Sequence, residues 1–219
     1  MSEAAKIFWN SSNAKNYPVM LRFDNDKESW GPGYTQRELI GKSMRDKRWI
    51  PEEGAILDLG AGPCTKFIFG PEIASERVWA VDFSPTLLEK SGVPEERRTV
   101  DDLTTMRFPR EWKNKFDLAT AVLLFRYLTL QERKELILKV KNALTVNGRI
   151  VIIDFETMRQ DEISEEIGEA EQFCLRETCS QLEDAGLGDV ESGKSNYLFE
   201  DGAGDSAPLS VGWVTAVKR

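Results

Sequence analysis

Short apolar runs alternate with amphipathic stretches along residues 54–155 of this 219-residue chain. Each run is bounded by glycine, proline or charged residues and has the length of a buried strand. The stretches between the runs have helical spacing instead, as in Leu136, Ile137 and Val140, which follow the N-cap candidate Thr129. The runs predict strands at 54–59, 77–82, 98–100, 116–124 and 150–155. Strands that alternate with helices favour a parallel sheet with right-handed crossovers.

The C-terminal third is predicted to add a long helix and a hairpin. The helix is expected over about 166–185, ending at Gly186. Two further strands, 189–199 and 209–218, are joined by the loop 200–205 and are typical of an antiparallel hairpin. We therefore expect an α/β protein with a doubly wound, seven-stranded, mostly parallel sheet, an antiparallel C-terminal hairpin and helices on both faces.

Residues 1–50 differ in composition from the rest of the chain. They contain nine Lys/Arg against six Asp/Glu, whereas the whole chain has a net charge of −8. Aromatic residues are frequent there, among them Trp9, Tyr17, Trp30 and Tyr34. Aromatic side chains of this kind can attach N-terminal helices to the main domain. We expect an N-terminal helical segment over 1–50 and a main domain over 51–219.

Composition and charge narrow the class of protein. With 41% hydrophobic and 30% charged residues, the chain is long enough for one domain with its own core. The net charge of −8 argues against a protein built mainly to bind nucleic acid. No signal-peptide core and no run of membrane-spanning length is found, so we expect a cytoplasmic protein that does not contact membranes.

The reactive side chains available are also restricted. The chain has no histidine, which excludes His-dependent triads, His general bases and His metal sites. Its cysteines, Cys64, Cys174 and Cys179, lack the spacing of a metal site, and no metal is expected. Any proton removal therefore falls to a carboxylate, a tyrosine, a lysine or water.

The stretch 55–65 is the clearest candidate for a cofactor loop. An apolar run ends in Asp58 and leads at once into a turn with Gly60 and Gly62. Glycine allows positive φ and leaves no Cβ in the way of a ligand. A dinucleotide loop would have a third glycine at its sixth place, where this chain has Thr65. An ordinary tight turn between a strand and a helix is the alternative without a ligand.

A second carboxylate, Asp82, ends the next predicted strand, 22 residues after Gly60. In doubly wound folds an acid at this place binds ribose hydroxyls. Asp82 therefore favours a nucleoside cofactor, without deciding which one.

The order of these motifs resembles a known family. Asp58-Leu59-Gly60-Ala61-Gly62 resembles motif I of the class I S-adenosylmethionine-dependent methyltransferases. Asp82, Asp102-Leu103, Phe116-Asp117 of motif IV and the terminal hairpin follow in the family's order, over about residues 54–219. The resemblance implies a Rossmann-like fold with an inserted antiparallel last strand, S-adenosyl-L-methionine as cofactor, and residues 1–50 as a lid. Cys64 stands where the family often has a third glycine.

The resemblance also assigns the cofactor site. In this family the loop backbone meets the methionine part of the cofactor, and the first acid lies close to its amino group. An acid after the third strand lies beside the adenine amino group; Asp102 fits this place better than Asp101, and an N-cap role is the structural alternative. The implied cofactor-binding residues are Asp58, Gly60, Ala61, Gly62, Asp82, Phe83, Asp101, Asp102, Leu103 and Ala121.

The end of motif IV indicates the acceptor class. Family members that methylate amino groups of bases or glutamine usually have Asn/Asp/Ser-Pro-Pro-Tyr or Phe there, whereas this chain has Leu124-Phe125-Arg126-Tyr127. The difference favours in-line methyl transfer to a small-molecule acceptor, for which alignment of the reactants is the main requirement. The side chains expected to orient the acceptor or take its proton are Tyr17, Tyr127, Asp154 and Glu156.

Two other functions stay open from the sequence. Cys64 in place of the third glycine leaves open a methyltransferase-like binding or regulatory domain without catalysis. An NAD-type oxidoreductase is the second alternative, against which Thr65 and the terminal hairpin count.

Overall fold

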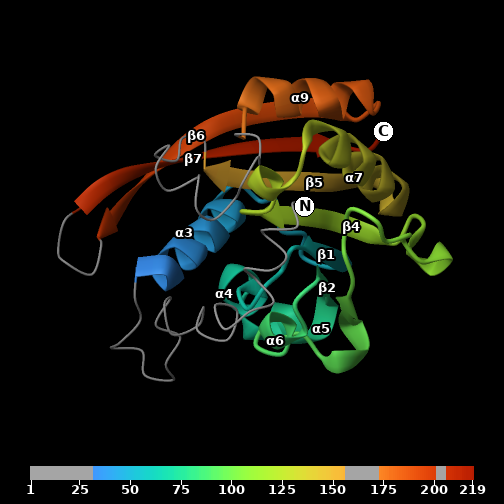
Figure 1. The fold of residues 1–219 in the computed structure, drawn as a ribbon, viewed down its shortest axis with the longest axis horizontal. Helices are drawn as coiled ribbons and strands as arrows, with labels where there is room; N and C mark the ends of the chain where they lie inside the picture. The colour runs from blue at the N-terminus through green and yellow to red at the C-terminus, as the bar shows by residue number, and fades with distance from the viewer. Residues whose placement is uncertain (1–31, 156–172, 201–205) are drawn as a thin grey trace.

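A central sheet of seven strands organises the protein (Figure 1). The computed structural model describes residues 32–155, 173–200 and 206–219. The strands are β1 (Ala55–Leu59), β2 (Val78–Asp82), β3 (Arg98–Val100), β4 (Phe116–Val122), β5 (Leu144–Phe155), β6 (Gly188–Glu200) and β7 (Ser206–Val217). The described α-helices are α3 (Pro32–Asp46), α4 (Thr65–Phe69), α5 (Pro71–Arg77), α6 (Pro85–Leu88), α7 (Leu130–Ala143) and α9 (Leu175–Asp184). Short 3₁₀ turns are η2 (Glu95–Arg97), η3 (Arg110–Trp112) and η4 (Phe125–Tyr127).

The strand order is β3-β2-β1-β4-β5-β7-β6. Strands β1 to β5 pair in parallel, whereas β7 lies antiparallel between β5 and β6. The order reverses between β1 and β4: β2 and β3 lie on one side of β1, and β4 and the later strands lie on the other. The predicted mostly parallel sheet with an antiparallel C-terminal pair is confirmed.

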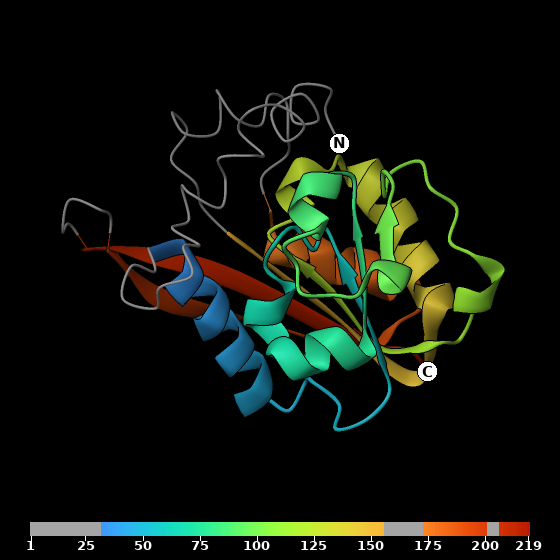
Figure 2. The same cartoon turned by 90° about the horizontal axis from the view of Figure 1, so that it is seen from below.

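Helices cover both faces of the sheet (Figure 2). One core cluster joins Ile40 of α3 and Ile68 of α4 to Ile56 of β1. The other joins Ile137 of α7 to Leu57 of β1. Because successive strand residues point to opposite faces, β1 supplies both clusters from neighbouring positions. The predicted helices on both faces are therefore also confirmed.

Local signals in the sequence set several helix ends. Thr129 and Glu132 form a capping box at the start of α7, as the N-cap candidate predicted. Gly70 separates α4 from α5, with φ of +91° at the glycine and Pro71 opening the second helix.

Several predicted boundaries are wrong, and β7 also begins at Ser206 rather than at residue 209. Strand β4 ends at Val122 rather than at residue 124, because Leu123 takes a left-handed φ of 57° and leaves the strand. Strand β5 begins at Leu144 rather than at residue 150, and it contains an irregularity with φ of 67° at Asn147. In the described residues α9 begins at Leu175 rather than near residue 166, because Cys174 is extended.

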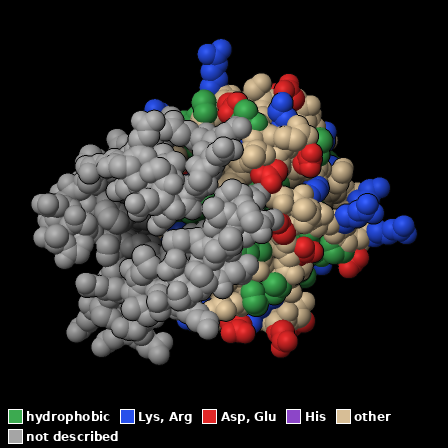
Figure 3. All heavy atoms as spheres, viewed as in Figure 1, with side chains coloured by type: hydrophobic (Ala, Val, Ile, Leu, Met, Phe, Trp, Pro, Cys, Tyr) green, Lys and Arg blue, Asp and Glu red, His purple; other side chains and the backbone are tan. Residues whose placement is uncertain are grey.

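The described surface is mixed in charge. On the face in Figure 3, acidic and basic side chains are interspersed over the part that is not grey. None of the helices among the described residues has both the length and the apolar character needed to cross a membrane.

Candidate functional site

A cavity opens at the carboxyl ends of β1, β2, β3 and β4. It contains about 840 Å³ of empty space, its open mouth included. Its walls are the loop after β1, the ends of β2 and β3, and the segment from Val122 to Leu128 after β4. This is the edge of an open parallel sheet at which ligands bind, beside the point where the strand order reverses.

The glycine loop forms one wall of the cavity. Gly60 and Gly62 both have positive φ, 64° and 51°. A Cβ on Gly60 would lie 2.9 Å from Leu124 Cδ1, whereas one on Gly62 would meet nothing within 4 Å. The loop is tied to β2, because the backbone N–H of Ala61 donates to the Val81 carbonyl at 3.1 Å. A ligand in the cavity could therefore approach the backbone closely at Gly62.

Asp58 lies at the base of this wall and is buried. Its two oxygens accept hydrogen bonds from Thr65 Oγ1 at 2.7 Å and Thr120 Oγ1 at 2.8 Å. Burial raises the pKa of Asp58 to about 6, although both hydroxyls act in the opposite direction. Asp82 raises this pKa further, since two neighbouring carboxylates repel each other when both are ionised.

Asp82 lies at the end of β2 and lines the same cavity. Its carboxylate accepts the backbone N–H groups of Gly62 and Ser84, each at 2.9 Å. Burial raises the pKa of Asp82 to about 6, against the effect of these backbone donors. A carboxylate offers about four acceptor positions, so capacity remains for a ligand hydroxyl.

The loop after β3 contributes Asp101, Asp102 and Leu103. Asp102 Oδ1 accepts both the backbone N–H of Thr104 at 3.0 Å and its hydroxyl at 2.8 Å. Lys139 of α7 holds the far side of this loop by donating to the Leu103 and Thr104 carbonyls at 3.1 and 3.2 Å. Asp102 thus has the turn-forming role that its N-cap alternative anticipated, while it also lines the cavity.

The segment after β4 forms the opposite wall. Arg126 lies over the rings of Tyr127 and Phe155, 4.9 and 4.8 Å from their centroids, and donates to the Tyr127 hydroxyl at 3.1 Å. Its backbone N–H donates to Asp154 Oδ2 at 3.0 Å, and its Nε lies 3.8 Å from Asp154 Oδ1. The Arg126 side chain is thereby fixed between an aromatic pair and a buried carboxylate.

Most of the predicted cofactor-binding residues, but only one of the predicted catalytic residues, line the cavity. All the predicted cofactor-binding residues except Ala121 line the cavity; Ala121 is buried in the core cluster beneath α7. Of the predicted catalytic residues, Tyr127 lines the cavity. Asp154 is 0% exposed and lies behind Arg126, and burial raises its pKa while Arg126 opposes the rise. Tyr17 and Glu156 lie outside the described residues, as do Trp9 and Trp30.

Several residues of the cavity wall were not predicted from motifs, among them Arg37 and Leu123. Arg37 of α3 lines the cavity and is only 6% exposed. Leu123 lines it as well, in the left-handed conformation that bulky residues rarely take. Arg37 had a signal in the sequence, because it shares the helical spacing of the buried Ile40 and Met44. A charged residue within an apolar stripe indicates a buried partner or a ligand.

Comparisons with known proteins identify the fold. No family model and no curated sequence matches the chain. Among solved structures, phosphoethanolamine N-methyltransferase 2 of Haemonchus contortus, in complex with S-adenosyl-L-methionine, matches with a TM-score of 0.68 at 16% identity. That match covers 100% of this chain, which spans 60% of the other.

Two further structures match over nearly their whole length. An S-adenosylmethionine-dependent methyltransferase of Thermotoga maritima, described as a possible histamine N-methyltransferase, gives a TM-score of 0.68 at 13% identity, over 99% of this chain and 100% of that one. A TehB-like methyltransferase of Corynebacterium glutamicum gives 0.56 at 17% identity, over 95% and 97%. The chain therefore has the fold of the class I S-adenosylmethionine-dependent methyltransferases.

The cavity also suits this cofactor chemically. Asp82 can accept ribose hydroxyls, and the room at Gly62 admits a ligand against the loop backbone. Asp58 and Asp82 place negative charge near the base of the cavity, which favours a cationic ligand.

Proposed function

We propose that this protein transfers the methyl group of S-adenosyl-L-methionine to a small-molecule acceptor. The observation that supports this most directly is the meeting of Gly62, Asp82 and Asp102 at one cavity. These residues come from the ends of three different strands, which is how a doubly wound fold builds a nucleoside site.

The chain's own residues divide between holding the cofactor and holding the acceptor. Bound S-adenosyl-L-methionine supplies a methyl group that is already activated on a sulfonium. We assign the ribose to Asp82, the adenine amino group to Asp102, and the amino group of the methionine part to Asp58 with the glycine loop. Alignment of the two reactants then provides most of the rate enhancement, on the order of 7–11 kcal/mol in favourable cases.

The acceptor is assigned to the wall formed by Arg126 and Tyr127. The Tyr127 hydroxyl accepts a hydrogen bond from Arg126 at 3.1 Å, which holds the phenol in place on the cavity wall. In a chain without histidine, this phenol is a group that can orient an acceptor or take its proton. Asp154 acts through Arg126, which separates it from the cavity. Tyr17 and Glu156 remain candidates from the sequence.

The fold neighbours suggest the first acceptors to test. One is named for phosphoethanolamine and another for histamine, and both names describe small amines. An acceptor screen should therefore begin with small primary and secondary amines.

Calorimetric titration of the full chain with S-adenosylmethionine, S-adenosylhomocysteine and NADH tests the cofactor. We expect both sulfur nucleosides to bind and NADH not to bind; binding of NADH alone would instead make the site a dinucleotide site. Transfer of label from methyl-labelled S-adenosylmethionine to the amine panel then tests catalysis. Tight cofactor binding without turnover on any acceptor would favour the binding or regulatory alternative.

A further inference from the structure

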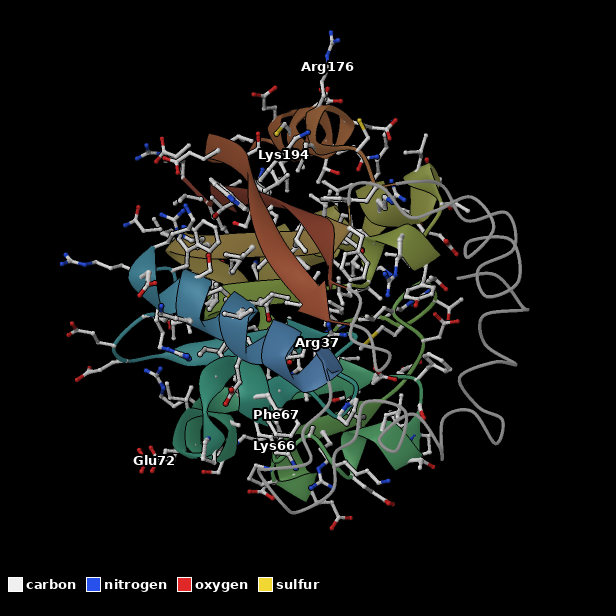
Figure 4. The ribbon with its side chains drawn as sticks, turned by 90° about the vertical axis from the view of Figure 1, so that its left-hand side faces the viewer. Arg37, Lys66, Phe67, Glu72, Arg176 and Lys194 are labelled. Atoms are coloured by element: carbon white, nitrogen blue, oxygen red, sulfur yellow. The ribbon has the colours of Figure 1, made fainter. Side chains whose placement is uncertain are left out.

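Two arginines, Arg37 and Arg126, line the cavity, and they come from different elements of the fold. Arg126 faces Asp154 on the wall after β4. Arg37 comes from α3, which packs against α4, the helix that follows the glycine loop. Figure 4 shows Arg37 on α3, above Lys66 and Phe67 of α4.

The electrostatic neighbours of Arg37 place it beside the base of the glycine loop. Burial raises the pKa of Asp58 and of the Cys64 thiol, and the guanidinium of Arg37 acts against the rise at both groups. Arg37 therefore lies close to the first acid of the loop and to the residue that ends the loop. It is 6% exposed, so its charge has been transferred out of water into the cavity wall.

This corner of the cavity carries one buried cation and one buried anion next to open space. Asp58 is the anion and Arg37 is the cation, and a Cβ at Gly62 would meet no protein atom within 4 Å. An amino acid group is a zwitterion, with an ammonium and a carboxylate on one carbon, and matches such a pair in both signs. A guanidinium has five N–H donors in a planar fork that fits a carboxylate.

We propose that Arg37 binds the α-carboxylate of the amino acid part of the cofactor. The inference rests on the proposed function, since it requires S-adenosylmethionine in this cavity. It makes α3 a part of the cofactor site: the helix contributes a side chain that recognises the cofactor, in addition to covering the sheet.

The test compares two ligands that differ in the amino acid part. S-adenosylhomocysteine carries it, whereas 5′-methylthioadenosine has a methyl group in its place. In R37M, calorimetry should show S-adenosylhomocysteine weakened by about 10- to 100-fold, the range for a lost charge-assisted hydrogen bond. The affinity for 5′-methylthioadenosine should not change. R37K keeps the charge without the fork and should fall between wild type and R37M.

Arg45 on the same helix provides a matched control. It is exposed, lies away from the cavity wall, and donates from Nη1 to the Ile68 carbonyl at 3.1 Å. R45M removes a link between α3 and α4 and should leave the ratio of the two affinities as in wild type.

The following results would overturn the assignment of Arg37 to the cofactor carboxylate. Equal weakening of both ligands in R37M would mean that Arg37 only supports the fold, and unchanged binding of both would also overturn the proposal. If R37M does not fold, wild type is titrated with decarboxylated S-adenosylmethionine, which should bind at least tenfold more weakly than S-adenosylmethionine; equal affinities would refute the inference. If wild type binds none of these nucleosides, the proposed function itself fails.

Discussion

Asp82 accepts the backbone N–H of Gly62 at 2.9 Å, so the end of β2 holds the glycine loop that follows β1. The same carboxylate accepts Ser84 N–H at 2.9 Å and thereby fixes the start of the next helix. One buried side chain thus sets the shape of two walls of the cavity.

Replacing Asp82 with alanine should weaken S-adenosylhomocysteine binding by about 10- to 100-fold, because a charged acceptor of ligand hydroxyls is lost. Calorimetry on D82A measures the change. D117A is the control: Asp117 also holds backbone, accepting Ala55 N–H at 3.1 Å, but lies outside the cavity wall. An equal loss of affinity in both variants would contradict the assignment of Asp82.

The buried Asp58 should make stability depend on pH. Its pKa is raised from 3.8 to about 6 in the folded protein, so folding is favoured when this carboxyl is protonated. This contribution is complete below about pH 4 and is lost as the pH rises through about 6, amounting to up to about 3 kcal/mol. D58N has no charge to bury, so its stability relative to wild type should rise between these pH values.

Urea unfolding of wild type and D58N at about pH 4 and above about pH 6 measures this difference. D58N should at the same time bind S-adenosylmethionine more weakly, because a negative charge near the cationic ligand is removed. A stability difference that is the same at both pH values would show that Asp58 does not titrate in this range.

The two loop glycines should respond differently to alanine. Gly62 has φ of 51° and open space at its Cβ position, so G62A should cost about 1 kcal/mol of stability but weaken cofactor binding more than about tenfold. G60A brings a Cβ within 2.9 Å of Leu124 and should lose more stability. Thermal unfolding and calorimetry on the same samples separate the two effects.

Gly70 supplies the control for these variants. It also has positive φ, and a Cβ added there would meet no atom within 4 Å, but it lies between α4 and α5, outside the cavity wall. G70A should lose at least as much stability as G62A and keep wild-type affinity. If G62A also kept its affinity, the space at Gly62 would not be the cofactor site.

Replacing Asp154 should reduce the stability of the protein through its contacts with arginine, rather than remove a group that contacts the acceptor. D154A removes the buried carboxylate that lies 3.8 Å from Arg126 Nε and close to the buried Arg133, which should cost about 3–5 kcal/mol in urea unfolding. D154N keeps an acceptor for the Arg126 N–H and should cost less. A D154N protein of wild-type stability that has lost methyl transfer would instead place Asp154 in contact with the acceptor.

Much of the fold could be predicted from the sequence, because the central strands β1, β2, β4 and β5 are rich in apolar residues. The end of β4 could not, because Leu123 takes its left-handed φ in a tertiary setting, with its N–H donating to the Ile153 carbonyl at 2.7 Å. Leucine has no intrinsic preference for that conformation. The start of α9 was also missed, since an extended Cys174 has no marker in the sequence.

The meeting of three carboxylates at one cavity could be predicted from the sequence for a similar reason. Asp58, Asp82 and Asp102 each lie at or just after the end of a strand, and the carboxyl ends of parallel strands meet at one edge. Arg37 was missed because it comes from a helix that precedes the sheet. The burial of Asp154 follows from strand alternation, since it shares a face with Ile152, which packs in the same cluster as Ile137 of α7.

The place of β7 has a consequence for how the protein is made. It is the last strand along the chain, yet it pairs with β5 from Arg149↔Val217 to Phe155↔Val211, inside the sheet. While the ribosome is still translating residues 206–217, the outer edge of β5 shows unpaired backbone, the kind of edge that recruits strands from other chains. The sheet can therefore close only after residues 206–217 have been made, and until then β5 is an edge strand open to pairing with other chains.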